Sequence, residues 1–338
     1  KPADDVASLA HYYRGLLLTA RAPVDAAADN PTLQRAVTSL EQALDGPLGE
    51  SQKLESWQLL ARLYRTAGQT DKALAAFEQL SRRKKPAEFE TPVAMWIGRE
   101  LLRRGDADKA IRWFALVLER SGLDADTETE ALFRAGQAYR ELDQWDRAID
   151  AFRKVVAFGH GFGDQGRLGL AQALAGAGQV DEALDEYDML MSAESSRVAA
   201  TALFEGAQLR MKRANQYAAA KDERRASVER REARKRLNRL VILYSLPQLE
   251  PLPQQALLDL ARLDMAAGEP DAAHEHYREL IQRFGDSPWA AIARAEVMIL
   301  DGKRGDGVFL LRKVATESGS DVVKQAARRR LQELGETP

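Results

Sequence analysis

Residues 57–80 read WQLLARLYRTAGQTDKALAAFEQL and decide the fold class. Apolar residues recur at helical spacing on both sides of Gly68, which is placed to end a first helix because glycine adopts the left-handed conformation without a Cβ clash. Thr70 or Asp71 is placed to cap a second helix. The stretch therefore predicts a hairpin of two amphipathic helices, and such a hairpin needs neighbours to cover its apolar face.

The same pattern recurs about every 35 residues, which indicates a tandem helical repeat. A small residue recurs in the first helix at Ala61, Gly98, Gly136, Ala171, Gly206, Ala261 and Ala295. The second helix carries an alanine followed four residues later by an aromatic residue, at Ala73/Phe77, Ala110/Phe114, Ala148/Phe152, Ala183/Tyr187 and Ala273/Tyr277. The turn carries Gly68, Gly105, Gly178, Gly268 and Gly302, with Asp143 in that place once. We expect the small residues to allow close helix packing and the aromatic rings to fill the space between repeats.

This pattern resembles the tetratricopeptide repeat family, whose units of about 34 residues carry W-x-x-L-G-x-x-Y, then A-x-x-x-F, then P. Residues 57–64, 73–77 and Pro86 match it, with Ala61 in place of the glycine. Residues 136–152 contain a second good match. The resemblance implies an all-α fold, a right-handed α-solenoid of antiparallel helix pairs with a C-terminal capping helix.

We expect one such solenoid over residues 1–338. Its parts are a divergent helix pair at 1–50, regular repeats at 54–198, an irregular repeat at 199–253, further repeats at 254–318 and the capping helix at 321–334. A capping helix needs a polar outer face, which residues 321–334 offer. Asp264 departs from the pattern, because it stands where an apolar or aromatic residue is expected.

Composition restricts the functional classes. The formal net charge of the 338 residues is −2, so the whole chain has no bias toward nucleic acid or anionic membranes. The absence of cysteine excludes disulfides, thiolate catalysis and thiolate metal sites. No apolar run approaches the roughly 20 residues that a membrane-spanning helix needs. No charged and then apolar leader opens the sequence, so we expect any targeting segment to lie outside it.

The irregular repeat is the most individual part of the chain. No glycine or proline occurs between Leu209 and Leu240, which predicts two elongated helices with a projecting hairpin around 218–226 and a stiff proline-rich connector at 245–253. Residues 210–239 hold 12 Lys/Arg and 4 Asp/Glu. The basic projection could hold nucleic acid, an acidic protein or lipid headgroups, or its charges could simply be solvated. Only one aromatic residue lies there, which disfavours nucleic acid. The candidate residues are Arg224, Arg225, Arg230, Arg231, Arg234 and Lys235.

The family resemblance implies a concave groove lined by the first helices of the repeats. The candidate groove residues are Gln58, Arg62, Arg65, Met95, Arg99, Arg103, Phe133, Gln137 and Arg140. Arginines bind carboxylates bidentately, so this groove suits an extended or helical ligand with acidic groups. The alternative is that the arginines pair with Glu55, Glu130 and Glu141. In later repeats we expect a second, apolar contact surface, formed by Leu168, Leu203, Leu258, Met265, Trp289 and Ile292.

We expect no catalytic residue, cofactor or metal. Residues 161–166 match G-x-G-x-x-G, but a dinucleotide site needs this motif after a strand, and residues 145–158 have a helical period. We interpret the motif as a loop between repeats. His274 and His276 are two residues apart and point in different directions on a helix, and His276 could pair with Glu279 instead.

The expected function is a non-catalytic scaffold or adaptor that binds a peptide, helix or partner domain, in a bacterial envelope assembly or secretion complex. One alternative is the repeat region of a larger exopolysaccharide or secretion exporter. Another is a regulator that binds a polyanion or acidic partner through 210–239. Residues 284–290, FGDSPWA, resemble the Y-P-x-S-x-x-A linkers of bacterial envelope repeat proteins, which favours a periplasmic or envelope location over a cytoplasmic one. The partner and the oligomeric state stay open.

Overall fold

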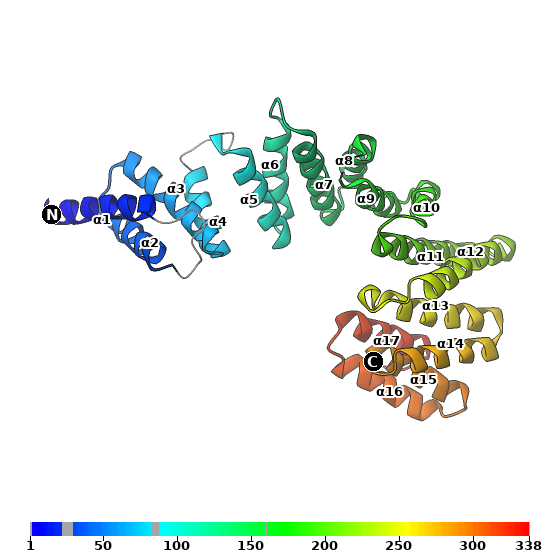
Figure 1. The fold of residues 1–338 in the computed structure, drawn as a ribbon. Helices are drawn as coiled ribbons and strands as arrows, with labels where there is room; N and C mark the ends of the chain where they lie inside the picture. Colours follow the sequence, from blue (N-terminus) through cyan, green and yellow to red (C-terminus); the bar gives the residue numbers. More distant parts are fainter. Residues whose placement is uncertain (1, 22–29, 83–87, 160, 338) are drawn as a thin grey trace. The chain divides into compact units, whose positions relative to one another are not determined.

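The computed structural model describes residues 2–21, 30–82, 88–159 and 161–337. Within these ranges the regular elements are helices, and no strand is present (Figure 1). The fold is therefore all-α, as the repeat pattern predicts. By its internal contacts the chain divides into two compact units, residues 1–142 and 143–338.

Unit 1 contains seven of the described helices. They are α1 Pro2–Arg21, α2 Pro31–Leu44, α3 Glu50–Thr66, α4 Thr70–Ser81, α5 Thr91–Arg103, α6 Ala107–Leu118 and α7 Ala125–Glu141. Unit 2 contains α8 Trp145–Phe158, α9 Gly163–Gly176, α10 Val180–Met189, α11 Ser196–Ala219, α12 Glu223–Leu243, the short 3-10 helix η2 Pro247–Leu249, α13 Leu252–Ala267, α14 Pro270–Arg283, α15 Pro288–Leu300, α16 Arg304–Glu317 and α17 Asp321–Glu333. Among the described helices, none is both long enough and apolar enough to cross a membrane.

From α3 onward, the turns after the odd-numbered helices contain a residue in the left-handed conformation. Gly68 follows α3 with φ 66°, and the next N–H, of Gln69, donates to the carbonyl of Tyr64 over 2.8 Å. Asp143 takes the same place with φ 54°, a conformation that Asp tolerates better than most side chains. The predicted cap of α4 was wrong, because α4 begins at Thr70 after Gln69 and no side chain forms a capping hydrogen bond there.

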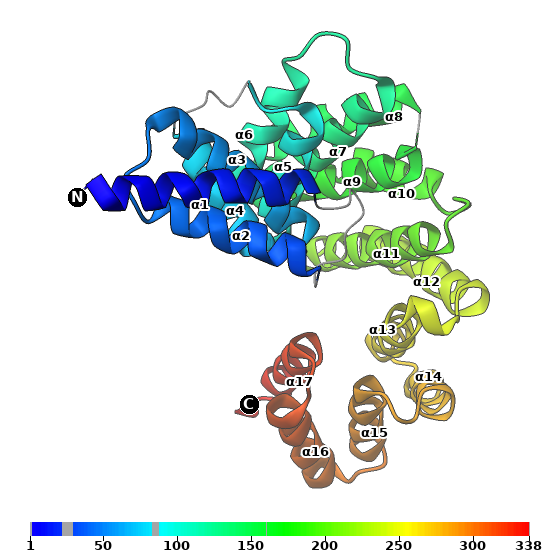
Figure 2. The ribbon, with the colours of Figure 1, turned by 60° about the vertical axis from the view of Figure 1, so that its left-hand side comes forward.

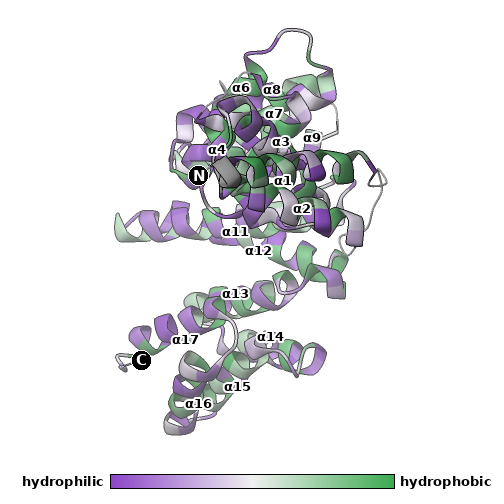
Figure 3. Ribbon diagram, turned by 90° about the vertical axis from the view of Figure 1, so that its left-hand side faces the viewer, coloured by the Kyte–Doolittle hydropathy of each residue, from purple (hydrophilic) through white to green (hydrophobic). Residues whose placement is uncertain are grey.

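The small and aromatic repeat positions pack as predicted. Phe114 and Phe152 are 0% exposed, and so are the repeat alanines Ala73, Ala110, Ala148, Ala183 and Ala273. A Cβ on Gly98 would lie 2.6 Å from Cε1 of Phe114, and one on Gly169 would lie 2.5 Å from Cε1 of Phe152. Glycine in an odd-numbered helix therefore makes room for the aromatic ring of an even-numbered one. Figure 3 shows that hydrophobic and hydrophilic residues alternate along the helices.

Helices α11 and α12 are the elongated pair of unit 2, with 24 and 21 residues. They run side by side (Figure 2) and are joined by a turn in which Lys221 has φ 62°. After α12 the connector is shorter than predicted, because η2 interrupts it and Pro253 already lies inside α13. The long helices bring side chains of the irregular repeat against the helices on both sides of it.

Candidate partner-binding site

Hydrogen bonds to carboxylates link successive odd-numbered helices. In unit 1, Tyr12 of α1 donates to Glu55 of α3, and Arg99 of α5 donates to Glu130 of α7 over 3.0 Å. Burial and the Glu55 carboxylate raise the pKa of Tyr12 to about 12. The links in unit 2 are Gln172–Glu205 (α9–α11), Gln208–Asp259 (α11–α13) and Arg330–Glu296 (α17–α15). These carboxylates therefore help to fix how neighbouring first helices pack.

Three of the predicted groove arginines in unit 1 have no carboxylate partner within the described residues. They are Arg62 and Arg65 of α3 and Arg140 of α7, of which Arg62 is exposed and the other two are half-buried. Gln58, one turn before Arg62, is exposed as well. Their charge is available to a ligand, in line with the predicted preference for acidic groups.

The other polar groove candidates form contacts inside the chain. Arg99 makes an ion pair with Glu130, as expected from the alternative in which the groove arginines pair with glutamates of the chain itself. Arg103 pairs with Glu100 on its own helix, with 2.9 Å between Nη2 and Oε2. Gln137 accepts a hydrogen bond from Arg134 over 3.1 Å. These side chains are at least partly neutralised or positioned by neighbours.

The two apolar groove candidates differ from the expectation. Met95 is 4% exposed and belongs to a buried cluster with Phe114, and Phe133 is 6% exposed. Both side chains pack into the core of unit 1, because the faces of α5 and α7 that carry them are covered by neighbouring helices. They are therefore not available as exposed apolar contacts.

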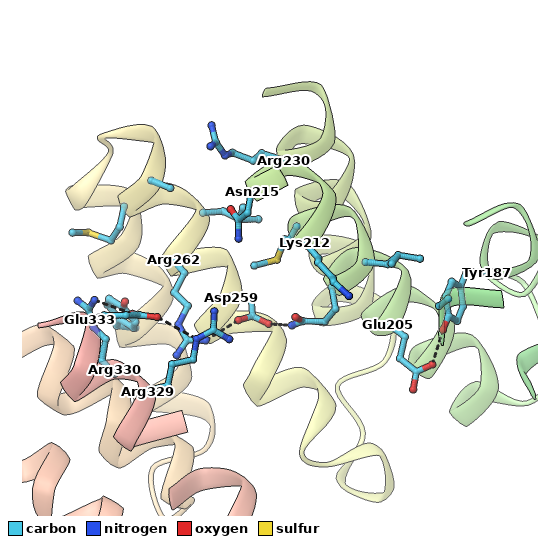
Figure 4. Close-up of a pocket in the computed structure, with 18 of the residues that line it drawn as sticks. Tyr187, Glu205, Lys212, Asn215, Arg230, Asp259, Arg262, Arg329, Arg330 and Glu333 are labelled. Carbon is cyan, nitrogen blue, oxygen red and sulfur yellow. Dashed lines mark hydrogen bonds and ion pairs between the residues drawn. The ribbon is translucent and has the colours of Figure 1, made fainter. Parts of the chain in front are cut away.

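Unit 2 contains a cavity of about 750 Å³ between α9, α10, α11, α12, α13, α14 and the C-terminal helix α17. Five cationic side chains and three carboxylates line it: Lys212, Arg230, Arg262, Arg329 and Arg330, with Glu205, Asp259 and Glu333. Figure 4 shows Arg262 and Arg329 close to Asp259, with Lys212 extending from the facing helix α11. The cavity therefore has an excess of positive charge.

Asp259 organises the charged end of this cavity. It is 5% exposed, accepts a hydrogen bond from the Gln208 amide, and lies 3.2 Å from Nη1 of Arg262. Burial raises the pKa of the Asp259 carboxyl, while the nearby Arg262 opposes that shift. The buried carboxylate thus holds Gln208 and Arg262 in place at the cavity wall.

Other cations of the cavity differ in how far they are neutralised. Arg330 is bound by the buried Glu296, at 2.6 and 3.0 Å, and Arg329 Nε lies 3.3 Å from Glu333. Within the described residues, Lys212 has no ion-pair partner, and it is exposed. Lys212 is therefore the cavity cation with the most charge available to a ligand.

The apolar contact surface expected in the later repeats is largely wrong. Leu203, Leu258 and Ile292 are at most 2% exposed, and Trp289 is 6% exposed, because all four form the core of unit 2. Met265 alone of the six predicted residues lines the cavity, where it is 39% exposed. The family pattern missed Lys212 and Arg329, since the first lies in the elongated helix and the second in the capping helix.

Much of the positive charge of residues 210–239 is neutralised inside unit 2. Glu229 is 8% exposed and lies 3.0 Å from Arg210 and 2.6 Å from Arg213. Arg236, 6% exposed, donates to Asp188 of α10. These residues anchor the long helices rather than face a partner.

The departure of Asp264 from the repeat pattern is also explained by an arginine of the long helices. Asp264 is 1% exposed, and Oδ1 lies 2.7 Å from Nη1 of Arg234 in α12. His276 Nε2 lies 3.9 Å from Oδ2 of Asp264, so its carboxylate neighbour is not Glu279 as expected. An acid replaces the usual apolar residue because the elongated α12 brings an arginine against it.

The remaining residues of the basic projection are less constrained. Arg225 pairs with Asp222, Arg230 with Glu223 and Lys235 with Glu232. Arg224 and Arg231 are exposed and have no ion-pair partner among the residues that the structure describes. Of the six candidates, these two therefore carry the most accessible charge.

The glycine motif at 161–166 has a packing role. It follows the helix α8, and α9 begins at Gly163, so only its start is a loop as predicted. A Cβ on Gly166 would lie 2.4 Å from Cγ1 of Val155, so this glycine allows α9 to approach α8. No group of three or more His, Asp or Glu side chains in the described part of the chain is arranged to hold a metal ion.

Comparisons with known proteins agree with this architecture. Residues 59–126, 130–157 and 254–297 match family models described as tetratricopeptide repeat. The chain is similar in structure to the apo form of RapI, at 12% identity and a TM-score of 0.57, covering 92% of this chain and 96% of that one. It is also similar to a tetratricopeptide repeat protein from Parabacteroides merdae, at 12% identity and a TM-score of 0.51, covering 82% and 98%. No curated protein matches the sequence.

At such identities the solved structures support the fold alone. The left-handed turn residues, the buried alanines and the buried aromatic rings recur through both units. Together with the three matching stretches, they show that the chain is a tetratricopeptide repeat protein with a tandem array of helix pairs.

Proposed function

We propose that this chain is a non-catalytic scaffold that binds an acidic segment of a partner protein in the cavity of unit 2. Tetratricopeptide repeats support a role in protein interaction. The observation that carries the finer proposal is the convergence of Lys212, Arg262 and Arg329 from three helices on one cavity. Each cation can bind a carboxylate, and a cluster of them selects a ligand that carries several.

The cavity is suited to a peptide because it combines fixed charge with apolar surface. Arg262 is held by the buried Asp259, so little side-chain entropy is lost when it binds a carboxylate. Leu209, Met211 and Met265 line the same cavity and can cover the apolar part of a peptide. This arrangement favours an acidic segment with interspersed apolar residues.

Arg62, Arg65 and Arg140 of unit 1 extend the proposal to a second set of cations. They lack carboxylate partners within the described residues, so they can also bind the carboxylates of an acidic ligand. The single scaffold would then contact an acidic partner at more than one place along its sequence.

Peptide selection tests the proposal. Random peptides displayed on phage are selected on the full chain, on a Lys212→Glu/Arg329→Glu variant and on a Lys303→Glu/Arg328→Glu control. The control residues are exposed and do not line the cavity, and Arg328 is the immediate neighbour of Arg329. Circular dichroism of all three proteins verifies that they are folded.

We expect wild type and control to retain the same peptides rich in Asp and Glu, and the cavity variant to lose at least one group of them. Charge reversal at two contacts predicts a loss of at least about tenfold in affinity, since each tenfold needs only about 1.4 kcal/mol. Retention of the same acidic peptides by the cavity variant, or selection of peptides without acidic residues, overturns the proposal.

We also propose a periplasmic or envelope location. The support is the resemblance of residues 284–290 to envelope repeat linkers. In the structure Ser287 accepts a hydrogen bond from the N–H of Ala290 over 3.1 Å, and Pro288 opens α15, as helix starts require. Immunodetection in fractionated source cells tests it, and finding the chain only in the cytoplasmic fraction contradicts it.

A further inference from the structure

The face of α12 that points away from the core carries a continuous basic stripe. Positions 224, 228, 231, 235, 239 and 242 are separated by three or four residues, which places them on one side of a helix. The residues are Arg224, Val228, Arg231, Lys235, Arg239 and Ile242, and all six are exposed. None is acidic, and none lines the cavity of unit 2. From first to last the stripe spans about 27 Å at 1.5 Å per residue.

The stripe keeps its positive charge in the folded chain. Arg224 and Arg231 have no ion-pair partner within the described residues. Within the described residues, the exposed Lys235 pairs only with the half-buried Glu232 on its own helix, at 2.7 Å, and such surface pairs contribute little. Arg239 donates to a main-chain carbonyl, that of Met191, over 3.3 Å, which leaves its charge uncompensated.

The opposite face of α12 is firmly anchored. Glu229 holds two arginines of α11, Arg236 binds Asp188 of α10, and Arg234 binds the buried Asp264 of α13. Leu237 and Leu240, on the same inner side, are 0% exposed. The stripe is therefore carried on a helix that is fixed before any partner arrives, so binding to it costs little ordering entropy.

Exposed apolar side chains occur along this basic face. Val228 is 47% exposed between Arg224 and Arg231, and Ile242 and Leu243 at the end of α12 are 76% and 55% exposed. Burying them contributes to binding a protein, whereas the phosphate backbone of a nucleic acid offers no apolar surface to cover them. The aromatic ring of this hairpin, Tyr217, already has the Arg225 guanidinium 5.6 Å from its centre. These features favour a protein partner over a nucleic acid.

We propose that this stripe of α12 is a docking surface for an acidic amphipathic helix of a partner protein. Neighbouring cations of the stripe are seven or four residues apart and match carboxylates with the same spacing on a second helix laid along α12. An apolar residue at the end of that helix would cover Ile242. The surface does not depend on the proposed cavity site, since the two share none of the six residues.

Binding of a synthetic helix to the full chain tests this inference. The probe is a fluorescent helical peptide of about five turns, which matches the length of the stripe, with Glu on one face and Leu at one end. Its partner probe has Gln in place of each Glu. Fluorescence anisotropy is measured with wild type, Arg224→Glu/Arg231→Glu, Ile242→Ser and the control Lys303→Glu/Arg328→Glu. The four substituted stripe and control cations are exposed, so each variant is expected to fold.

The expected result has three parts. The Glu peptide binds wild type and the control alike, the Arg224/Arg231 variant loses at least about tenfold in affinity, and the Ile242 variant loses about threefold. The Gln peptide binds at least about tenfold more weakly than the Glu peptide. Binding of the Glu peptide weakens between about 50 and 200 mM salt, as partly exposed ion pairs do.

Several outcomes would overturn the inference. One is equal binding to wild type and the Arg224/Arg231 variant, and another is no binding at all. A third is tighter binding of wild type to duplex DNA, or to vesicles with anionic lipid, than to the Glu peptide. The Lys212→Glu/Arg329→Glu variant must still bind the Glu peptide, because a loss there places the contact in the cavity and supports only the proposed function.

Discussion

Arg213 of α11 donates to Glu229 of α12 over 2.6 Å, and the carboxylate is 8% exposed. Arg210 reaches the second oxygen of Glu229 at 3.0 Å. Two guanidinium groups and one carboxylate are thus held between the two long helices, away from most of the solvent. The carboxylate compensates charge that would otherwise be costly to bury.

Replacing Glu229 with Gln should lower the free energy of unfolding by about 1.5–3 kcal/mol, because two largely buried arginines lose their shared carboxylate and keep only Asp181 and Asp188 as partners. Urea denaturation measures the loss. The matched control is Glu232→Gln on the same helix, where the ion pair with Lys235 is exposed and the expected cost is below about 1 kcal/mol. Equal costs for the two variants would contradict the assigned role of Glu229.

Substituting Gly169 by Ala should cost about 1–3 kcal/mol, since the new Cβ would lie 2.5 Å from the Phe152 ring. Leu at position 152 removes the ring edge that causes this overlap. The two substitutions together should therefore cost less than the sum of the single ones. Thermal or urea unfolding of the four proteins in this cycle gives the coupling, and additive costs would show that the ring can move aside.

Reversing Arg62, Arg65 and Arg140 to Glu together should lower the free energy of unfolding only modestly, by about 0.3–1 kcal/mol for each of Arg65 and Arg140, which lie in the last turns of α3 and α7 where the helix dipole favours cations. None of the three has a carboxylate partner within the described residues, so the folded chain loses no ion pair. Arg99→Glu should lower the midpoint, because it places a second acid beside Glu130. If the triple variant also retains the acidic peptides of wild type unchanged, these three arginines are not ligand contacts.

The stability contributed by Asp259 should depend on pH. Burial raises its pKa in the folded chain above the value of about 3.9 expected in the unfolded chain. Between these two values the folded chain binds more protons, so the free energy of unfolding falls as pH rises. The contribution is fully present below the unfolded value and is lost as pH rises through the folded one.

Comparison with Asp259→Asn isolates this effect, because Asn does not titrate. The difference in unfolding free energy, wild type minus variant, should decrease as pH rises through that window. Urea titrations at a series of pH values above about 3.5 measure it. A difference that stays constant or increases with pH would show that burial does not outweigh Arg262 at this carboxyl.

Local sequence was enough to predict the repeat. Gly68 and Asp143 adopt the left-handed turn, and Phe114 and Phe152 are buried where the repeat places them. These outcomes depend on residues a few positions apart and on generic packing between neighbours, which a repeating pattern records directly.

The long-range polar contacts could not be predicted in this way. Asp264 and Arg234 are 30 residues apart, and nothing local signals that an acid at a usually apolar position faces an arginine of the preceding helix pair. Met95 and Phe133 were placed on the groove because the family rule gives positions, whereas their burial depends on which neighbouring helices cover them. The cavity was missed since Arg329 belongs to α17, outside the repeat pattern.

The ion pair between Asp264 and Arg234 also limits how this array can be rearranged. Repeats joined by apolar contacts alone can be duplicated, deleted or exchanged one at a time, because one alanine or leucine surface substitutes for another. Here, removing the pair α11–α12 would take away Arg234 and Gln208 and strand two buried acids, Asp264 and Asp259, in the next pair. We therefore expect the four helices α11–α14 to be transferable to another array only as a single block.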